Sequence, residues 1–133
     1  MAQRPEFSSY RDFFPYYVAM HSKAATRRLH FGGTLIGFSV ALVGLLTGRP
    51  RLLAAFPLIG YGTAWPAHWF IEKNNPASFG HPAWSLRGDF EMITYMVRGR
   101  DSELSRIAGD YLREHPENRT ASNWRDPADL LAA

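Results

Sequence analysis

Histidines are the residues of this chain whose type and spacing could do chemistry: His21, His30, His68, His81 and His115. Two of them are placed symmetrically about residues 49–50, because His30 lies 19 residues before Arg49 and His68 lies 19 residues after it. If the apolar runs 33–48 and 52–71 are helices, both imidazoles lie at the same end of a hairpin about 28 Å deep, close to the hydrocarbon thickness of a bilayer. Neutral imidazole is the commonest metal ligand in proteins, so this pattern indicates a metal or proton-transfer site at a membrane face.

Two charged residues near these histidines are candidate catalytic groups. Glu72 follows His68 by four residues, so it shares a helix face with His68 and could bind a metal or orient the imidazole. An ion pair at the helix end is the alternative for Glu72. Arg28, beside Arg27, could bind a carboxylate or a lipid headgroup, and a positive cluster next to a membrane is the alternative.

The composition restricts the chemistry further. The 133 residues form one domain and include no cysteine, so a metal would need imidazole and oxygen ligands, which suit iron, zinc, manganese or copper. The net charge of +3 is too low and too dispersed to argue for nucleic-acid binding. The chain also lacks the glycine-rich nucleotide fingerprints and the nucleophile elbow of serine hydrolases.

The elements that must position the histidines are helices. The apolar centre and polar ends predict an all-α, multi-pass helical membrane protein with a central apolar hairpin, interfacial helices and a C-terminal amphipathic helix at 101–115. Ser9 is expected to cap a first, aromatic helix. One straight helix would put His21 and His30 on opposite faces, so a break is predicted near residues 22–25.

Later segments complete this prediction. Residues 72–88 are expected to form a loop, and Asp89 is expected to cap a short helix over 89–97. Gly37, Ala41 and Gly44 predict close approach of the hairpin helices. We expect a membrane-embedded, histidine-rich metal domain at 1–100, and a soluble amphipathic helix with a polar tail at 101–133.

The distribution of basic residues predicts the orientation of the hairpin in the membrane. Most basic residues flank the open end of the hairpin, and two arginines mark its turn. By the positive-inside tendency both termini would face the cytoplasm, in a bacterial inner membrane. A soluble helical hairpin remains the alternative for the apolar runs.

Two motifs carry a family resemblance. The first is residues 17–21 followed by RRLHFGGT at 27–34, and the second is GYG at 60–62, Trp65, HWFIEKN at 68–74, His81-Pro82 and Gly88-Asp89. With these motifs, residues 13–99 resemble the membrane family of fungal 2-hydroxy fatty acid dioxygenases, in a bacterial-type form. The chain departs from that pattern at Ala67, where glycine is expected, and at 22–26, which lacks an expected asparagine.

The resemblance implies a cofactor, a substrate and a ligand set. It implies Fe(II) held by the metal ligands His21, His30, His68 and His81, whereas His115 matches no position of the family. It implies oxidation of a 2-hydroxy long-chain fatty acid by O2, with loss of one carbon and without 2-oxoglutarate. Such alpha-oxidation operates in phytosphingosine breakdown.

The sequence therefore supports one main hypothesis and two alternatives. The main hypothesis is an Fe(II)-dependent dioxygenase with Glu72 and Arg28 as catalytic residues, and with a 2-hydroxy fatty acid, O2 and membrane lipid as partners, but no nucleic acid. The alternatives are a non-catalytic membrane scaffold or lipid-binding protein, and a different metal-dependent lipid enzyme such as a zinc hydrolase.

Overall fold

The computed structural model describes residues 5–125, and these are helical, with no strand among them. The first four residues and the end of the predicted polar tail, 126–133, lie outside this part. The elements are α1 (Tyr10–Ala19), α2 (Ala24–Leu46), η1 (Pro50–Ala54), α3 (Ala55–Ala67), η2 (His68–Glu72), η3 (Ala77–Phe79), α4 (Pro82–Val97), α5 (Asp101–Glu114) and η4 (Pro116–Asn118). The prediction of an all-helical fold is confirmed.

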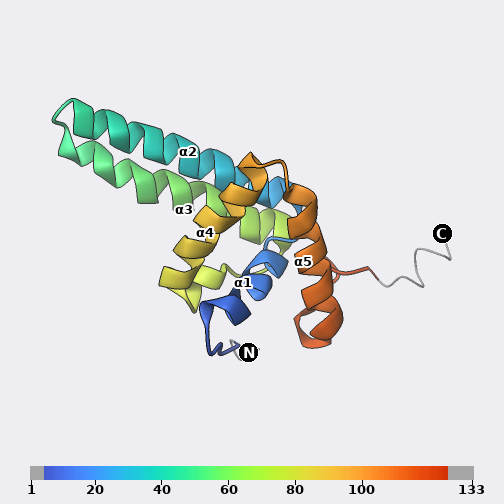
Figure 1. The fold of residues 1–133 in the computed structure, drawn as a ribbon. Coiled ribbons are helices and arrows are strands. Elements are labelled where there is room, and N and C mark those ends of the chain that lie inside the picture. The colour runs from blue at the N-terminus through green and yellow to red at the C-terminus, as the bar shows by residue number, and fades with distance from the viewer. Residues whose placement is uncertain (1–4, 126–133) are drawn as a thin grey trace.

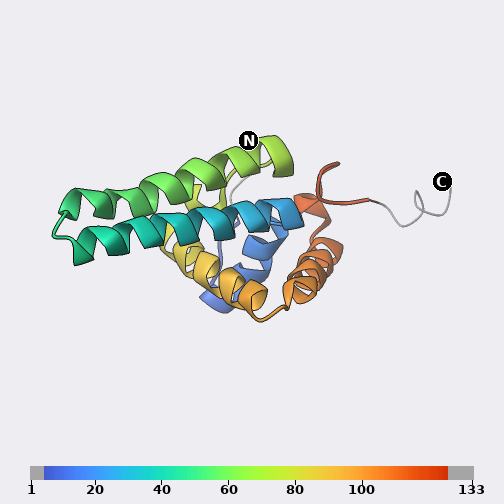
Figure 2. The ribbon, with the colours of Figure 1, turned by 90° about the horizontal axis from the view of Figure 1, so that it is seen from above.

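Helices α2 and α3 form a long antiparallel hairpin that projects from the remaining helices (Figures 1 and 2). Small residues allow the two backbones to approach. A Cβ on Gly37 would lie 3.0 Å from the carbonyl oxygen of Phe56, and a Cβ on Gly44 would lie 2.7 Å from the Cβ of Leu52. The predicted close approach is therefore confirmed at Gly37 and Gly44.

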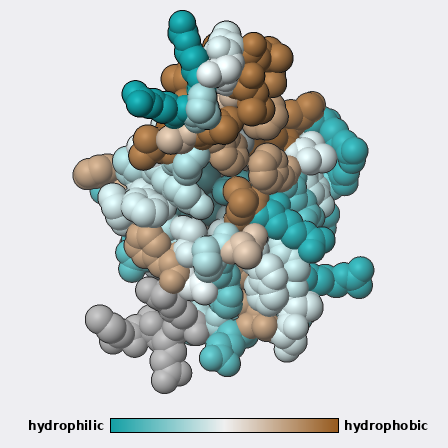
Figure 3. Space-filling view, turned by 90° about the vertical axis from the view of Figure 1, so that its left-hand side faces the viewer, coloured by the Kyte–Doolittle hydropathy of each residue, from teal (hydrophilic) through white to brown (hydrophobic). Residues whose placement is uncertain are grey.

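The projecting part of the hairpin has an exposed apolar surface. Helix α2 has 23 residues and is long and apolar enough to cross a membrane, yet only 28% of its most apolar window is buried. Its exposed apolar side chains include Leu35, Ile36, Phe38, Leu42, Val43, Leu45 and Leu46. Figure 3 shows the largest gathering of apolar surface in the upper part of this face, and mostly polar surface with smaller apolar patches below it. Within residues 5–125, α2 is the one candidate span, where the sequence predicts several.

The other helices build a core at the base of the hairpin. Phe13, Val18, Met92, Leu104 and Leu112 are almost completely buried there, and they come from α1, α4 and α5. Burying a side chain of this kind contributes about 1.5–3 kcal/mol. Helix α5 thus shares a core with the helices that precede it.

The start of the chain follows the sequence-based expectation. Ser9 caps α1, because its hydroxyl oxygen accepts a hydrogen bond from the backbone N–H of Asp12 at 3.3 Å. Helix α1 ends at Ala19 and α2 begins at Ala24, so the predicted break between His21 and His30 is confirmed.

The segment before residue 89 differs in part from the prediction. The predicted loop is confirmed between Glu72 and Pro82, where η3 is the one short turn. Helix α4 begins at Pro82, so the predictions of a loop over 82–88 and of Asp89 as an N-cap are wrong. Pro82 suits a first helical position because its φ is already helical and its missing N–H needs no partner. Gly88 does not end the loop but packs on α1, since a Cβ there would lie 3.0 Å from the ring of Tyr17.

Candidate metal centre

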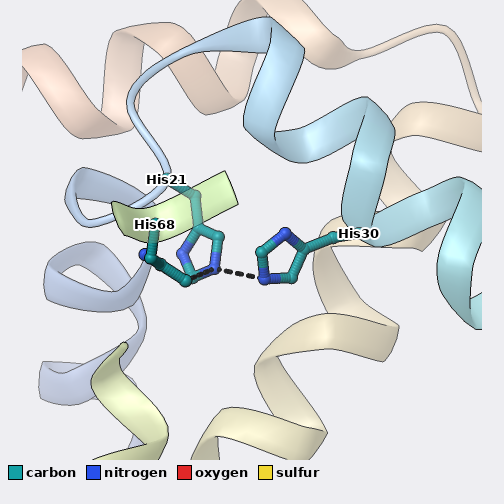
Figure 4. Close-up of side chains that lie close together, drawn as sticks. All are labelled: His21, His30 and His68. Atoms are coloured by element: carbon teal, nitrogen blue, oxygen red, sulfur yellow. Dashed lines mark hydrogen bonds between the residues drawn. The ribbon is translucent and has the colours of Figure 1, made fainter. Parts of the chain in front are cut away.

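Three histidines meet at the base of the hairpin (Figure 4). His21 lies in the α1–α2 connection, His30 lies near the start of α2, and His68 begins η2 directly after α3. Their exposed fractions are 1%, 5% and 2%. The Nε2 atom of His21 lies 3.1 Å from Nε2 of His30 and 3.1 Å from Nε2 of His68. The predicted meeting of His30 and His68 is confirmed, because their ring centroids are 5.2 Å apart.

The other ring nitrogen of each histidine is held by an oxygen. Nδ1 of His21 donates to the carbonyl oxygen of Tyr17 at 2.6 Å, and Nδ1 of His30 donates to that of Thr26 at 3.0 Å. Nδ1 of His68 donates to Oδ1 of Asn74 at 2.8 Å. Because these oxygens accept the Nδ1 protons, a neutral imidazole at each position has its lone pair on Nε2.

The three Nε2 lone pairs point toward one another, an arrangement that is stable when a cation lies between them. Neutral imidazoles that donate from Nδ1 have no proton to share between their Nε2 atoms, so contacts of 3.1 Å between these atoms are unfavourable on their own. Two nitrogens bound to one ion at about 2.1 Å, and separated by roughly 90–110°, would lie about 3.0–3.4 Å apart. The residues present could therefore hold a metal ion.

The surroundings favour the neutral form that binds metal. Burial lowers the pKa of His21 well below its usual range, and the neighbouring imidazoles and Arg27 lower it further. Neutral His21 therefore offers its Nε2 lone pair without first losing a proton at neutral pH.

Asn74 orients His68, and sequence reasoning missed this role. Helix η2 ends at Glu72 and the next residue, Lys73, has a left-handed φ of 61°. The backbone N–H of Asn74 then donates to the carbonyl oxygen of His68 at 3.1 Å. The Asn74 amide nitrogen donates to the carbonyl oxygen of Met20 at 3.0 Å, which leaves its Oδ1 facing His68. The available signal was the position of Asn74 at the end of the HWFIEKN motif.

Replacing Asn74 by alanine is expected to weaken metal binding about 10–100-fold, because the hydrogen bond that fixes the His68 ring would be lost. Asn75→Ala is the matched control, since Asn75 is the exposed neighbour. Titration of each variant with Fe(II) under nitrogen measures the effect. Equal affinities of the two variants would contradict the assigned role of Asn74.

Glu72 is buried, but it does not belong to the group of side chains that could hold a metal ion. Its carboxylate accepts hydrogen bonds from the Ser22 hydroxyl at 2.8 Å and from the backbone N–H of Lys23 at 2.7 Å. It therefore ties η2 to the connection that carries His21. Glu72 as a catalytic residue stays a prediction, and Asn74 holds the orienting place considered for Glu72.

The two adjacent arginines have different environments. Arg28 is exposed, and its role toward a substrate stays a prediction. Arg27 is 1% exposed and donates to both carboxylate oxygens of Asp101 at 2.7 Å. It also donates to the carbonyl oxygens of His21 and Ser22, at 3.0 and 2.8 Å. Arg27 thus joins the His21 connection to α5.

His81 is not brought together with the three histidines. Its Nε2 donates to the carbonyl oxygen of Pro5 at 3.1 Å, and its ring stacks on Trp84 with centroids 5.4 Å apart. His115 is half-buried and pairs with Glu117 at 2.9 Å. His81 as a fourth metal ligand stays a prediction.

A cavity of about 20 Å³ adjoins the three histidines. Its lining includes Trp65 of α3 and Ser85 and Asp89 of α4. The indole nitrogen of Trp65 and the hydroxyl of Ser85 are buried, and neither has a hydrogen-bond partner among the residues that the structure describes. The Tyr17 hydroxyl donates to Asp89, and burial raises the pKa of Asp89 to about 6. The cavity therefore combines a carboxylate with two unused donors.

The described part of the protein is all-helical. It combines an exposed apolar hairpin with three buried histidines whose ring nitrogens lie close together. Residues 7–101 match the model of the family described as 2-hydroxy-palmitic acid dioxygenase Mpo1-like. This match covers more than half of the chain, so the chain belongs to that family, and the resemblance carried by the two motifs is confirmed. No curated protein and no solved structure matches the chain.

Proposed function

We propose that this protein is an iron(II)-dependent dioxygenase that shortens 2-hydroxy long-chain fatty acids by one carbon. The observation that carries the proposal is the convergence of three Nε2 lone pairs from His21, His30 and His68 in a chain of the dioxygenase family. These three residues would hold the metal ion. A bound iron(II) ion would supply the O2 chemistry and a place for the 2-hydroxyl and carboxylate of the substrate.

The residues of the chain set the charge balance of the site. Three neutral imidazoles leave the two positive charges of a divalent ion uncompensated, and a buried charge needs a partner. Ionised Asp89 would supply one negative charge and the substrate carboxylate would supply the other. The Tyr17 hydroxyl stabilises ionised Asp89 by donating a hydrogen bond to it.

The proposed reaction needs no co-substrate besides O2. One 2-hydroxy acid and one O2 balance as the acid shortened by one carbon, CO2 and water, so no 2-oxoglutarate is needed.

The site also excludes most solvent water. The cavity of about 20 Å³ has space for little more than one water molecule. Such a site limits side reactions with solvent water.

The membrane location is part of the proposal. Helix α2 spans about 34 Å at roughly 1.5 Å per residue, which suffices for a hydrocarbon core of about 30 Å. His30 lies near the beginning of this helix, so the metal site would lie at the membrane face. A fatty acid could then reach the site from the bilayer. We propose a multi-pass protein of the bacterial inner membrane with cytoplasmic termini.

The first test is elemental analysis of protein purified in detergent without oxygen, followed by O2 uptake with 2-hydroxyhexadecanoate. The expected result is about one iron per chain, with equal amounts of O2 consumed and CO2 released. Zinc at full occupancy without O2 uptake would support the hydrolase alternative. No metal after exposure to Fe(II) would support the scaffold alternative, and either result would overturn the proposal.

A further inference from the structure

A second, larger cavity shares part of its lining with the cavity of about 20 Å³ beside the three histidines, which we call the metal cavity. The larger cavity measures about 170 Å³ and lies among α2, α3 and α4. Tyr61 and Asp89 line both cavities, so the larger cavity adjoins the histidine site. The remaining lining residues are mostly apolar or small: Thr34, Phe56, Pro57, Gly60, Leu86 and Phe90. We call this cavity the apolar groove.

The size of the groove fits a segment of hydrocarbon chain. A cavity of about 150 Å³ accepts a benzene molecule, so the groove has room for roughly six carbon atoms. A long acyl chain would continue beyond it. Leu86 and Phe90 of the groove are 41% and 46% exposed, and the neighbouring Leu58 is 73% exposed. The groove therefore opens beside apolar surface that suits contact with lipid.

The metal cavity has the opposite character. The Ser85 hydroxyl, in a residue 4% exposed, and the Trp65 indole N–H have no partner within residues 5–125. A buried donor without an acceptor costs free energy, so an oxygen of a bound ligand is the expected partner. Indole N–H can only donate, which selects an acceptor such as a carboxylate or hydroxyl oxygen.

We propose that a 2-hydroxy fatty acid binds with one carboxylate oxygen in the metal cavity, which has space for little more than one oxygen atom, and with its chain in the apolar groove. Trp65 and Ser85 donate hydrogen bonds to this carboxylate oxygen. The chain passes between Tyr61 and Asp89, and its far end leaves the groove beside Phe90 toward lipid. This binding mode rests on the proposed function, because it assumes that the histidine site receives the 2-hydroxy acid.

Gly60→Leu tests the position of the chain. A Cβ on Gly60 meets no atom within 4 Å, so a leucine side chain can enter the groove without displacing the backbone. Gly62→Leu is the matched control, because Gly62 lies on the same helix with equal space and does not line the groove. The measurement is equilibrium binding of radiolabelled 2-hydroxyhexadecanoate and four-carbon 2-hydroxybutanoate to detergent-solubilised, Fe(II)-loaded protein under nitrogen.

Gly60→Leu is expected to weaken binding of the long acid at least tenfold, and to leave binding of the short acid within twofold of the original protein. Gly62→Leu is expected to change neither affinity. Equal binding of the long acid by Gly60→Leu and Gly62→Leu would overturn the assignment of the groove.

Ser85→Ala tests the position of the head. Loss of a hydrogen bond to a charged group is expected to weaken binding of both acids about tenfold. The thermal stability should not fall, because the hydroxyl has no hydrogen-bond partner in the described part of the chain, 5–125. Unchanged affinity for both acids would overturn the role of Ser85.

Photo-crosslinking tests the same binding mode in the unaltered protein, so its result does not depend on whether a variant folds. A 2-hydroxy fatty acid with a diazirine in the middle of its chain is expected to label peptides containing Phe56, Leu86 or Phe90 in the unaltered protein. Labelling confined to other segments would overturn the binding mode. Iron content distinguishes the two proposals: iron without binding in the groove contradicts only this inference, whereas absence of iron contradicts the proposed function.

Discussion

Replacing His68 by alanine is expected to abolish the proposed iron binding and the proposed O2 uptake with 2-hydroxyhexadecanoate. Loss of a residue that only orients a ligand reduces metal affinity about 10–100-fold, so loss of a ligand should exceed this range. Only two of the three converging nitrogens would remain, which leaves the ion weakly held. Elemental analysis after gel filtration measures the iron content, and we expect less than about one tenth of the original value.

His81→Ala is the control that separates the observed cluster from the four-histidine prediction. His81 donates to the carbonyl oxygen of Pro5 and stacks on Trp84, so its loss should leave the iron content within about twofold. Circular dichroism would verify that both variants stay helical. An unchanged iron content in folded His68→Ala would contradict the assignment of His68 as a metal ligand. Loss of iron in folded His81→Ala would instead support the prediction that His81 is a fourth ligand.

Replacing Arg27 by methionine is expected to lower the free energy of unfolding by about 3 kcal/mol, near the lower end of the effect of breaking a buried ion pair. The guanidinium makes five hydrogen bonds, to both oxygens of Asp101, to the hydroxyl of Ser105 and to the carbonyl oxygens of His21 and Ser22. The expected loss of stability is near the lower end of that range because the Asp101 side chain is 40% exposed and can be hydrated once Arg27 is removed. Denaturant unfolding in detergent, followed by circular dichroism, measures it.

Arg28→Met is the matched control, since Arg28 is the exposed neighbour and its loss should change stability by less than about 0.5 kcal/mol. Arg27→Met should also retain less iron, because Arg27 holds the connection that carries His21. Equal stability of the two variants would show that Arg27 does not join this connection to α5.

The same ion pair gives the stability a pH dependence. The hydrogen bond from Arg27 lowers the pKa of Asp101 below its usual value. A carboxylate with a lowered pKa in the folded state stabilises the protein above its unfolded pKa of about 3.9, and this stabilisation is lost as the pH falls through the folded pKa. The difference in stability between the original protein and Arg27→Met should therefore shrink below about pH 4.

The local sequence was sufficient to predict the elements that carry the histidines. Apolar runs on both sides of residues 49–50 predict two antiparallel helices, and equal spacing then places His30 and His68 at one end. The opposite faces of His21 and His30 on one helix predict the break that the structure shows between Ala19 and Ala24. These predictions hold because helical periodicity and chain length are local properties.

Contacts between distant segments decided the rest. Residues 82–88 contain proline and glycine, which favour a loop in isolation, but Gly88 is helical because its bare backbone packs on the ring of Tyr17, 71 positions earlier. His81 resembles the other histidines in sequence. Its separation from them depends on how α4 is placed against Pro5 and α1.

By itself, the sequence determined the helical class, the hairpin, the family and three of the histidines that the structure brings together. Only the tertiary structure decided that Asn74 orients His68, that Glu72 and Arg27 hold the His21 connection, and that an apolar groove adjoins the metal cavity. The physical reason is the range of the interactions: helix formation depends on residues three or four apart, whereas these contacts join segments that only packing brings together.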